Sequence, residues 1–228
     1  MPGGRGWRGE VPPEVIDEYR ERQRELAARV QFVPLGAAPR LIAAVDVHLR
    51  GEVGIAAVVQ MRYPELEVVE ELSASTPVDF PYIPGLLSFR EAPACLVAVR
   101  QLRAPPDLLL IDGQGRAHPR RFGLACHIGV ELDRPAIGVA KSILTGRYGE
   151  LGEARGSTAE LVSRGEVVGM AVRSRDGVTP LFISVGNRIT LPEAVEWTLR
   201  CCTRYRLPEP SRLAHRLAKR LAAEPPAS

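Results

Sequence analysis

The chain has 228 residues, of which 45% are hydrophobic and 25% are charged, and its formal net charge is +3. This composition is sufficient for one sizeable core, so one domain is expected rather than two. The net charge is too small to indicate nucleic-acid binding by itself.

Membrane and secretory signals are absent from the sequence. No apolar run approaches the length of a membrane span, and the first residues lack the apolar core of a signal peptide. We therefore expect a soluble, cytoplasmic monomer with no membrane partner. The four cysteines form no C-x-x-C pair, so buried thiols are expected rather than a zinc site.

The first half of the chain predicts a helix followed by three strands. Residues 1–10 are rich in glycine and arginine and are expected to form a disordered tail. Two prolines and early acidic residues open an amphipathic helix at Pro12–Val30. Strands are predicted at Leu41–Leu49, Val53–Arg62 and Leu66–Ser73. Their short connections require antiparallel neighbours.

Helices and strands alternate in the middle of the chain. Leu86–Leu102 is apolar enough for a mostly buried helix, and Asp107–Ile111 is a short apolar strand that suits a central parallel position. A helix at Phe122–Leu132 and a strand at Ala136–Ala140 continue the alternation. The pattern indicates a sheet that is covered by helices.

The last part of the chain predicts a hairpin and two helices. The hairpin joins Glu166–Ser174 to Thr179–Val185 around an Asp-Gly turn, and the helices span Pro192–Thr203 and Pro210–Leu221. The expected fold is α/β, with a mixed sheet of three antiparallel strands followed by parallel strands, flanked by helices. One domain is expected over residues 11–223, with a tail at 224–228.

Two apolar strands end in a carboxylate. Asp46 follows Leu41-Ile-Ala-Ala-Val, and Asp112 follows Leu108-Leu-Leu-Ile. Either residue alone is more often a turn former or a helix cap. If the strands are neighbours, both carboxylates can reach one cation, and Glu91 near a helix start would complete an all-oxygen site suited to Mg²⁺.

A stiff loop precedes Glu91. Pro81, Tyr82, Ile83 and Pro84 offer an aromatic and an aliphatic side chain on a backbone that proline restrains. Such a wedge can separate stacked bases. We expect an adjacent base pocket formed by Gly85, Leu86, Gly113, Gln114, Gly115 and His118. A plain strand-to-loop turn is the alternative for residues 113–115. A paired amide and carbonyl would accept hypoxanthine, which presents an O6 acceptor and an N1–H donor.

Other polar residues extend this interpretation. Lys141 ends a strand and would lie near a scissile phosphate if that strand is parallel to the one before Asp112. His215 could bind metal or shuttle a proton. It belongs to a basic helix in which Arg212, Arg216 and Lys219 could contact phosphates, although a solvated helix face explains the charge equally well.

These motifs together resemble the endonuclease V family, over about Leu41 to His215. The resemblance rests on Val45-Asp46-Val47, Phe80-Pro-Tyr-Ile-Pro-Gly-Leu86, Ser88-Phe-Arg-Glu91, Asp112-Gly113, His118-Pro-Arg-Arg-Phe-Gly-Leu-Ala, Gly138-Val-Ala-Lys141 and Leu207-Pro-Glu-Pro-Ser-Arg-Leu-Ala-His215. It implies an RNase H-like fold and a Mg²⁺-dependent enzyme, for which Mn²⁺ can substitute. Such an enzyme nicks DNA at the second phosphodiester 3′ to deoxyinosine and leaves 3′-hydroxyl and 5′-phosphate ends.

By this resemblance, Asp46 and Asp112 are metal ligands, Glu91, Lys141 and His215 belong to the catalytic site, and Tyr82 heads the wedge. Two positions depart from the family pattern. Gln114 stands where relatives often carry histidine or asparagine, and Asn187 stands where they often carry histidine. Neither is an acidic ligand, so cleavage should survive. Some members prefer inosine in RNA, which leaves an endoribonuclease as an alternative.

Two other functions compete with this interpretation. Another RNase H-like nuclease, such as a junction resolvase or an RNA-directed enzyme, would need the acidic site but not the wedge. A non-catalytic inosine-binding module that recruits repair factors would not need the acidic residues and Lys141 together. A nicking assay with and without Mg²⁺ distinguishes these functions.

Overall fold

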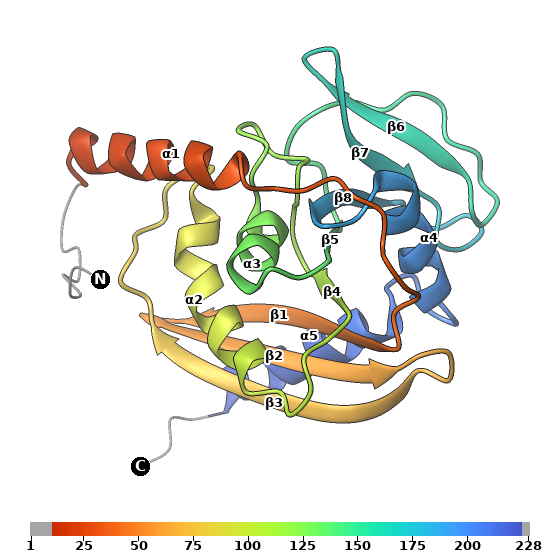
Figure 1. Cartoon of the computed structure of the whole chain (residues 1–228), viewed down its shortest axis with the longest axis horizontal. Coiled ribbons are helices and arrows are strands. Elements are labelled where there is room, and N and C mark those ends of the chain that lie inside the picture. Colours follow the sequence, from red (N-terminus) through yellow and green to blue (C-terminus); the bar gives the residue numbers. More distant parts are fainter. Residues whose placement is uncertain (1–10, 225–228) are drawn as a thin grey trace.

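A mixed sheet with the strand order β3-β2-β1-β4-β5-β8-β7-β6 forms the centre of the computed structural model, which describes residues 11–224 (Figure 1). The strands are β1 Leu41–Arg50, β2 Val53–Arg62, β3 Glu67–Pro77, β4 Leu108–Ile111, β5 Ala136–Ala140, β6 Thr158–Ser163, β7 Glu166–Val172 and β8 Leu181–Asn187. The helices are α1 Pro13–Ala27, α2 Leu87–Arg100, α3 Leu124–Leu132, α4 Leu191–Cys201 and α5 Glu209–Ala223.

The pairing of the strands confirms the predicted mixed α/β sheet. β1, β2 and β3 are successive antiparallel neighbours, whereas β4 pairs with β1 in parallel and β5 pairs with β4 in parallel. β4 is a four-residue strand whose residues are all buried, as its apolar sequence requires. β8 and β7 then continue the sheet in the antiparallel sense, so the predicted hairpin of these two strands is also confirmed.

Helices cover both faces of the sheet, and strand periodicity assigns residues to each face. Ile42 and Ala44 of β1 pack in the core beneath α4 and α5. Ala43 and Val45 pack in the opposite core, beneath α2 and α3. β4 alternates in the same way. Figure 1 shows α2 and α3 on one side of β1 and β4, with α5 on the other.

Strand β6 was not predicted, and it lies at one edge of the sheet. Its sequence, Thr-Ala-Glu-Leu-Val-Ser, has one large apolar residue, Leu161, that is fully buried, while Val162 is 38% exposed. This weak alternation is typical of an edge strand that has little core to cover. Leu66 was predicted to open β3 but has φ 54° and belongs to the preceding turn.

The predicted tail at residues 1–10 lies outside the described residues, as does the tail at 224–228 apart from Glu224. The four cysteines are free and buried, which agrees with the expectation of buried thiols. None of the described helices is both long and apolar enough to cross a membrane.

Candidate active site

Three strands direct polar side chains toward the same face of the sheet. Ala44, Leu110 and Val139 all belong to the core beneath α4 and α5. Two residues later, the same alternation brings Asp46, Asp112 and Lys141 to that face.

The parallel register then makes these side chains neighbours. Val45 is paired with Ile111, so Asp46 and Asp112 follow at adjacent positions. The Lys141 ammonium contacts Oδ2 of Asp112 directly. The expected proximity of two carboxylates and a lysine therefore exists in the fold.

Helix α5 adds His215 to the two carboxylates. Nδ1 of His215 lies 2.7 Å from Oδ2 of Asp46, and the Val47 amide donates to Oδ1 of Asp46 over 2.9 Å. A carboxylate can only accept, so Nδ1 carries the proton in this contact. In the neutral ring, Nε2 is consequently left with a free lone pair.

Glu91 belongs to α2 and reaches the acidic cluster from the other side. Burial, followed by the negative charge of Asp46, raises the pKa of Glu91 to about 7, while Arg90 acts in the opposite direction. Burial and Asp46 also raise the pKa of Asp112, against the lowering effect of Lys141. Neighbouring buried carboxyl groups that raise one another's pKa form a site in which a bound cation is favoured.

A cleft of about 450 Å³ contains this cluster. It brings together ten of the residues that the sequence selected: Asp46, Tyr82, Gly85, Glu91, Asp112, Gly113, Gln114, His118, Lys141 and His215. The other lining residues were not selected: Val47, His48, Leu87, Ser88, Gly123, Leu124, Ser142, Ile143 and Leu144. The acidic cluster and the expected base pocket are therefore parts of one cavity.

Unpartnered polar atoms lie buried along this cleft. His48 Nδ1, Ser88 Oγ and Gln114 Oε1 have no hydrogen-bond partner among the described residues. Such atoms are rare unless a ligand, ion or water satisfies them. Side-chain atoms of Asp46, His48 and His215 that can bind metal all lie within 4.8 Å of one another. Oxygen and imidazole ligands of this kind fit a divalent cation.

His48 is a site residue that the sequence reasoning missed. Its Nδ1 lies 3.6 Å from Oδ2 of Asp46, and its ring centroid lies 5.3 Å from that of His215. The signal was present in the sequence, because residues two apart on a strand share a face. A histidine two positions after a candidate metal ligand on a predicted strand should therefore be included in the site.

The predicted wedge loop presents Tyr82 to solvent. Tyr82 is 69% exposed and lines the cleft, whereas Phe80, two residues before it, is 7% exposed. The Leu86 amide donates to the Ile83 carbonyl over 2.9 Å and closes the turn that follows Tyr82. Pro81, Ile83 and Pro84 shape this loop but do not line the cleft.

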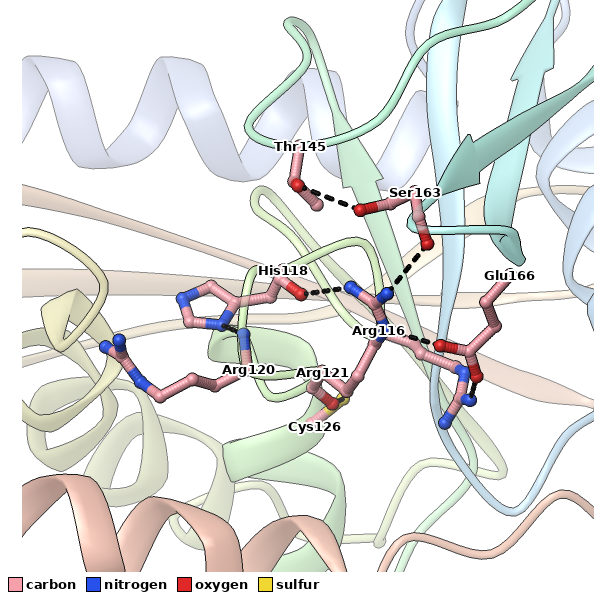
Figure 2. A network of polar contacts seen from close by, with 8 residues as sticks. All are labelled: Arg116, His118, Arg120, Arg121, Cys126, Thr145, Ser163 and Glu166. Carbon is pink, nitrogen blue, oxygen red and sulfur yellow. Dashed lines mark hydrogen bonds and ion pairs between the residues drawn. The ribbon is translucent and has the colours of Figure 1, made fainter.

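The wall of the cleft around His118 is held by a polar network (Figure 2). Nδ1 of His118 accepts from the Arg120 amide over 3.1 Å, so Nε2 carries the proton of the neutral ring. Burial, followed by the charge of Arg120, lowers the pKa of His118 to about 4. Arg121 donates to the carbonyls of His118 and Ser163, each over 2.9 Å, and ties the wall to the β6–β7 hairpin.

Some of the selected residues do not line the cleft. Leu86 is fully buried, so its side chain forms core beneath the pocket rather than pocket wall. Gly115 is also buried, and a Cβ added there would lie 2.2 Å from the Val185 carbonyl oxygen. Gly115 is therefore required for close backbone packing, which was the structural alternative for this turn.

The three α5 residues that were expected to contact phosphates, Arg212, Arg216 and Lys219, do not line the cleft. Arg216 and Lys219 line a separate groove beside β3. Arg212 forms an ion pair with Glu209 and stacks over Tyr205 at 4.4 Å from the ring centroid. Asn187 does not line the cleft either; its side chain accepts from the Gln31 amide over 3.0 Å and donates to the Gly129 carbonyl over 3.0 Å.

Comparison with known proteins identifies relatives over most of the chain. The sequence model of the family described as endonuclease V matches residues 24–216. An endonuclease V from Gloeobacter violaceus is 60% identical over 161 residues, which make up 70% of this chain and 65% of that protein.

Solved structures share the fold. The crystal structure of an endonuclease V from Streptomyces avermitilis has a TM-score of 0.87 and 43% identity and covers 93% of each chain. An endonuclease V from Ciona intestinalis, in complex with a 24-mer DNA containing an inosine followed by a ribo-adenosine, has a TM-score of 0.80 and 26% identity. That comparison covers 91% of this chain and 98% of the other.

Proposed function

The chain belongs to the endonuclease V family of nucleases, and from that premise we propose that it is a DNA repair endonuclease that recognises deoxyinosine. It hydrolyses the second phosphodiester bond 3′ to the lesion and leaves 3′-hydroxyl and 5′-phosphate ends. Its substrate is DNA in which adenine has been deaminated.

One observation carries this proposal: an acidic cluster and an exposed aromatic wedge line the same cleft. A nuclease site without base recognition would need Asp46, Glu91 and Asp112 but not Tyr82. The relative from Ciona intestinalis, which binds inosine-containing DNA, supports the same substrate class.

The donor set is suited to Mg²⁺, with Mn²⁺ as a substitute. Asp46 and Asp112 would hold the ion, Glu91 would complete the acidic site, and His215 would offer Nε2 nearby. When bound, a divalent cation supplies Lewis-acid stabilisation of phosphate charge and favours a nucleophilic water at neutral pH.

The protein's own groups account for positioning and charge. The Lys141 ammonium, held by Asp112, adds positive charge where the scissile phosphate would lie. If Nε2 of His215 does not bind the ion, it can instead accept a proton, because Asp46 orients the ring through Nδ1. Tyr82 fills the space from which the lesion leaves the stack.

Base selection would use donors and acceptors of the pocket wall. The neutral His118 ring, which carries its proton on Nε2 and hydrogen-bonds to the Gly85 backbone, would hold the wall against which hypoxanthine packs. The backbone of Gly113, which lines the cleft together with Gly85, can supply the paired acceptor and donor, because the Gly85 carbonyl already accepts from Gln23 and Arg120.

Matched oligonucleotides test the proposal. Duplexes that carry one deoxyinosine, one inosine or no lesion are incubated with Mg²⁺ or with a chelator, and the cut position is mapped. Deoxyinosine-dependent nicking at the second 3′ phosphodiester is expected in the presence of Mg²⁺ and not in the presence of the chelator. Selective binding without any nicking would instead indicate a recruiting module.

An inosine-specific endoribonuclease is the second candidate function. The ribo-adenosine that follows inosine in the DNA bound by the Ciona intestinalis relative favours it. Preferential cutting of the inosine oligonucleotide, or of a deoxyinosine duplex with one ribonucleotide 3′ to the lesion, would select this alternative.

A further inference from the structure

We propose that Gln23 and Arg120 are positioning residues that clamp the carbonyl of Gly85 and so hold the Tyr82 wedge beside the base pocket. This inference rests on the proposed function, because it assigns the two residues a part in deoxyinosine recognition. Neither residue lines the cleft.

Gln23 is the centre of the clamp. It is on α1 and is fully buried, although its amide is polar. Its Nε2 atom donates to the carbonyls of Gly85 over 3.0 Å and Phe122 over 2.9 Å. Both N–H groups of one amide are therefore used to join the wedge loop to the segment that leads into α3.

Arg120 completes the clamp from the loop that contains His118. Its Nη2 donates to the Gly85 carbonyl over 2.6 Å, and its Nε donates to Oε1 of Gln23. In Figure 2 the Arg120 side chain extends away from Glu166, while Arg121 and Arg116 face it. Arg120 thus ties the pocket wall to α1, whereas its neighbour ties the wall to the β6–β7 hairpin.

Gly85 is adapted to this contact. Its φ of +78° lies in the region that glycine adopts readily, and an added Cβ would lie 2.5 Å from Nη2 of Arg120. The positive φ of Gly85 therefore directs its carbonyl toward both Gln23 and Arg120.

The other end of the wedge loop is anchored by the same helix. The ring of Tyr19 on α1 packs against Phe80 with 4.5 Å between centroids. Arg90 donates to the Phe80 carbonyl over 2.9 Å. Tyr82 lies between two fixed points, Phe80 and Gly85, so the loop that carries its exposed ring is anchored at both ends.

This arrangement has a defined consequence for recognition. A wedge that is already placed loses little conformational entropy when it enters the duplex. Weakening the clamp should therefore lower affinity for deoxyinosine duplex and leave the chemical step at saturating substrate nearly unchanged, because the side chains of Gln23 and Arg120 hydrogen-bond to Gly85, Phe122 and each other rather than to the acidic cluster.

Four variants test the inference in the full chain. Arg120→Ala removes the charged donor, Arg120→Lys keeps the charge but loses the two-point contact, and Gln23→Glu keeps size but loses both N–H groups. Arg24→Ala is the matched control, because Arg24 is a neighbouring exposed arginine of α1 that pairs with Glu21.

Binding and single-turnover cleavage of deoxyinosine duplex are measured together. We expect the Kd to rise about tenfold in Arg120→Ala and Gln23→Glu, equivalent to about 1.4 kcal/mol. The saturating cleavage rate should stay within about threefold, and Arg120→Lys should recover part of the affinity. An unchanged Kd in Arg120→Ala would overturn the proposal, as would an equal loss of affinity for undamaged duplex.

A double-mutant cycle with Tyr82→Ala separates positioning from general stability. If Gln23 and Arg120 act through the wedge, adding Arg120→Ala to Tyr82→Ala should cost less than about twofold further in Kd. Fully additive losses would overturn the proposal. Arg120 is partly exposed, so this arm stands even if substitution of the buried Gln23 prevents folding.

Hydrogen exchange separates this inference from the proposed function. The amides of residues 82–87 should exchange faster in Arg120→Ala than in wild type or Arg24→Ala, without any nucleic acid present. Equal exchange would overturn the clamp, whatever the substrate. A wild type that fails to select deoxyinosine would overturn the proposed function and leave the exchange result standing.

Discussion

Nδ1 of His215 lies 2.7 Å from Oδ2 of Asp46, although 169 residues separate the two in the sequence. The contact joins the last described helix to the first strand of the sheet. It orients the imidazole with Nε2 free and fixes one oxygen of the carboxylate. The metal ligation and proton transfer proposed for this site would therefore depend on how α5 packs against β1.

Removal of either strand-end carboxylate should abolish cleavage. Asp46→Ala and Asp112→Ala are each expected to lower the cleavage rate in Mg²⁺ by at least about a hundredfold, because a bound cation contributes several kcal/mol to transition-state stabilisation. Binding to deoxyinosine duplex should remain within a few-fold of wild type. Single-turnover cleavage measures the rate, and Asp17→Ala, an exposed carboxylate on α1, is the control. A near-normal rate in either variant would refute the metal assignment.

His48 should support the metal site from a neighbouring position. His48→Ala is expected to raise the Mg²⁺ concentration for half-maximal cleavage by about 10–100-fold, the usual cost of losing a group that orients a metal ligand. Its Nδ1 is close to Asp46, and the rate at saturating Mg²⁺ should recover substantially. A Mg²⁺ titration at fixed substrate measures this. An unaltered midpoint would return His48 to a packing role.

Tyr82→Ala should weaken lesion recognition without altering the metal requirement. A stacked base contributes about 1–3 kcal/mol, so selective binding to deoxyinosine duplex is expected to fall by roughly ten- to a hundredfold. Remaining cleavage should still require Mg²⁺. Binding curves on deoxyinosine and undamaged duplexes measure the effect, with Tyr148→Ala as a tyrosine control outside the cleft. Unchanged discrimination would make the loop a structural turn.

The basic face of α5 can be tested by salt dependence. If Arg212, Arg216 and Lys219 contact phosphates, neutralising each should shallow the slope of log K against log salt by roughly one unit. Arg216 and Lys219 are exposed, whereas Arg212 already pairs with Glu209, so the effect at Arg212 should be smaller. Arg200→Gln on α4 is the control. Unchanged slopes in all three variants would show that this face of α5 is only solvated and does not contact phosphates.

His127 should make stability depend on pH. Burial, followed by the charge of Arg22, lowers the pKa of His127 to about 4, below the ordinary value of 6.5. The folded state therefore favours the neutral ring, and this contribution to stability is complete above pH 6.5 and is lost as pH falls toward 4. Between pH 7 and pH 5 the loss should be about 1–2 kcal/mol.

Urea unfolding at these two pH values measures the loss, and His127→Leu should lose less than wild type over the same interval. The His127 ring packs between Phe89 and Phe122, at centroid distances of 5.0 and 5.5 Å, so leucine preserves an apolar contact there. Equal pH dependence in the two proteins would show that protonation of His127 does not control the effect.

The sequence sufficed for the acidic strand ends because hydrophobic periodicity is local. Four or five apolar residues before Asp46 and Asp112 define buried strands, and parallel pairing then brings their ends together. The face that each side chain adopts also follows from alternation. These features needed no knowledge of distant contacts.

Other features depended on contacts that no local pattern carries. Gln23 meets Gly85 across 62 residues, and nothing in α1 distinguishes this glutamine from a solvent-exposed one. Leu86 was predicted to line the pocket because of its position in the motif, but its side chain is fully buried in the core. β6 was not predicted, because an edge strand needs few apolar residues and so gives a weak sequence pattern.

The alternation that unites Asp46, Asp112 and Lys141 makes the site sensitive to the length of three strands. Deleting or inserting one residue in β1, β4 or β5 would turn the final side chain of that strand to the face covered by α2 and α3. Amino-acid replacements in these strands can be absorbed by repacking, whereas a single-residue change in length cannot. Insertions should instead accumulate in exposed connections such as residues 51–52, the turn between β1 and β2.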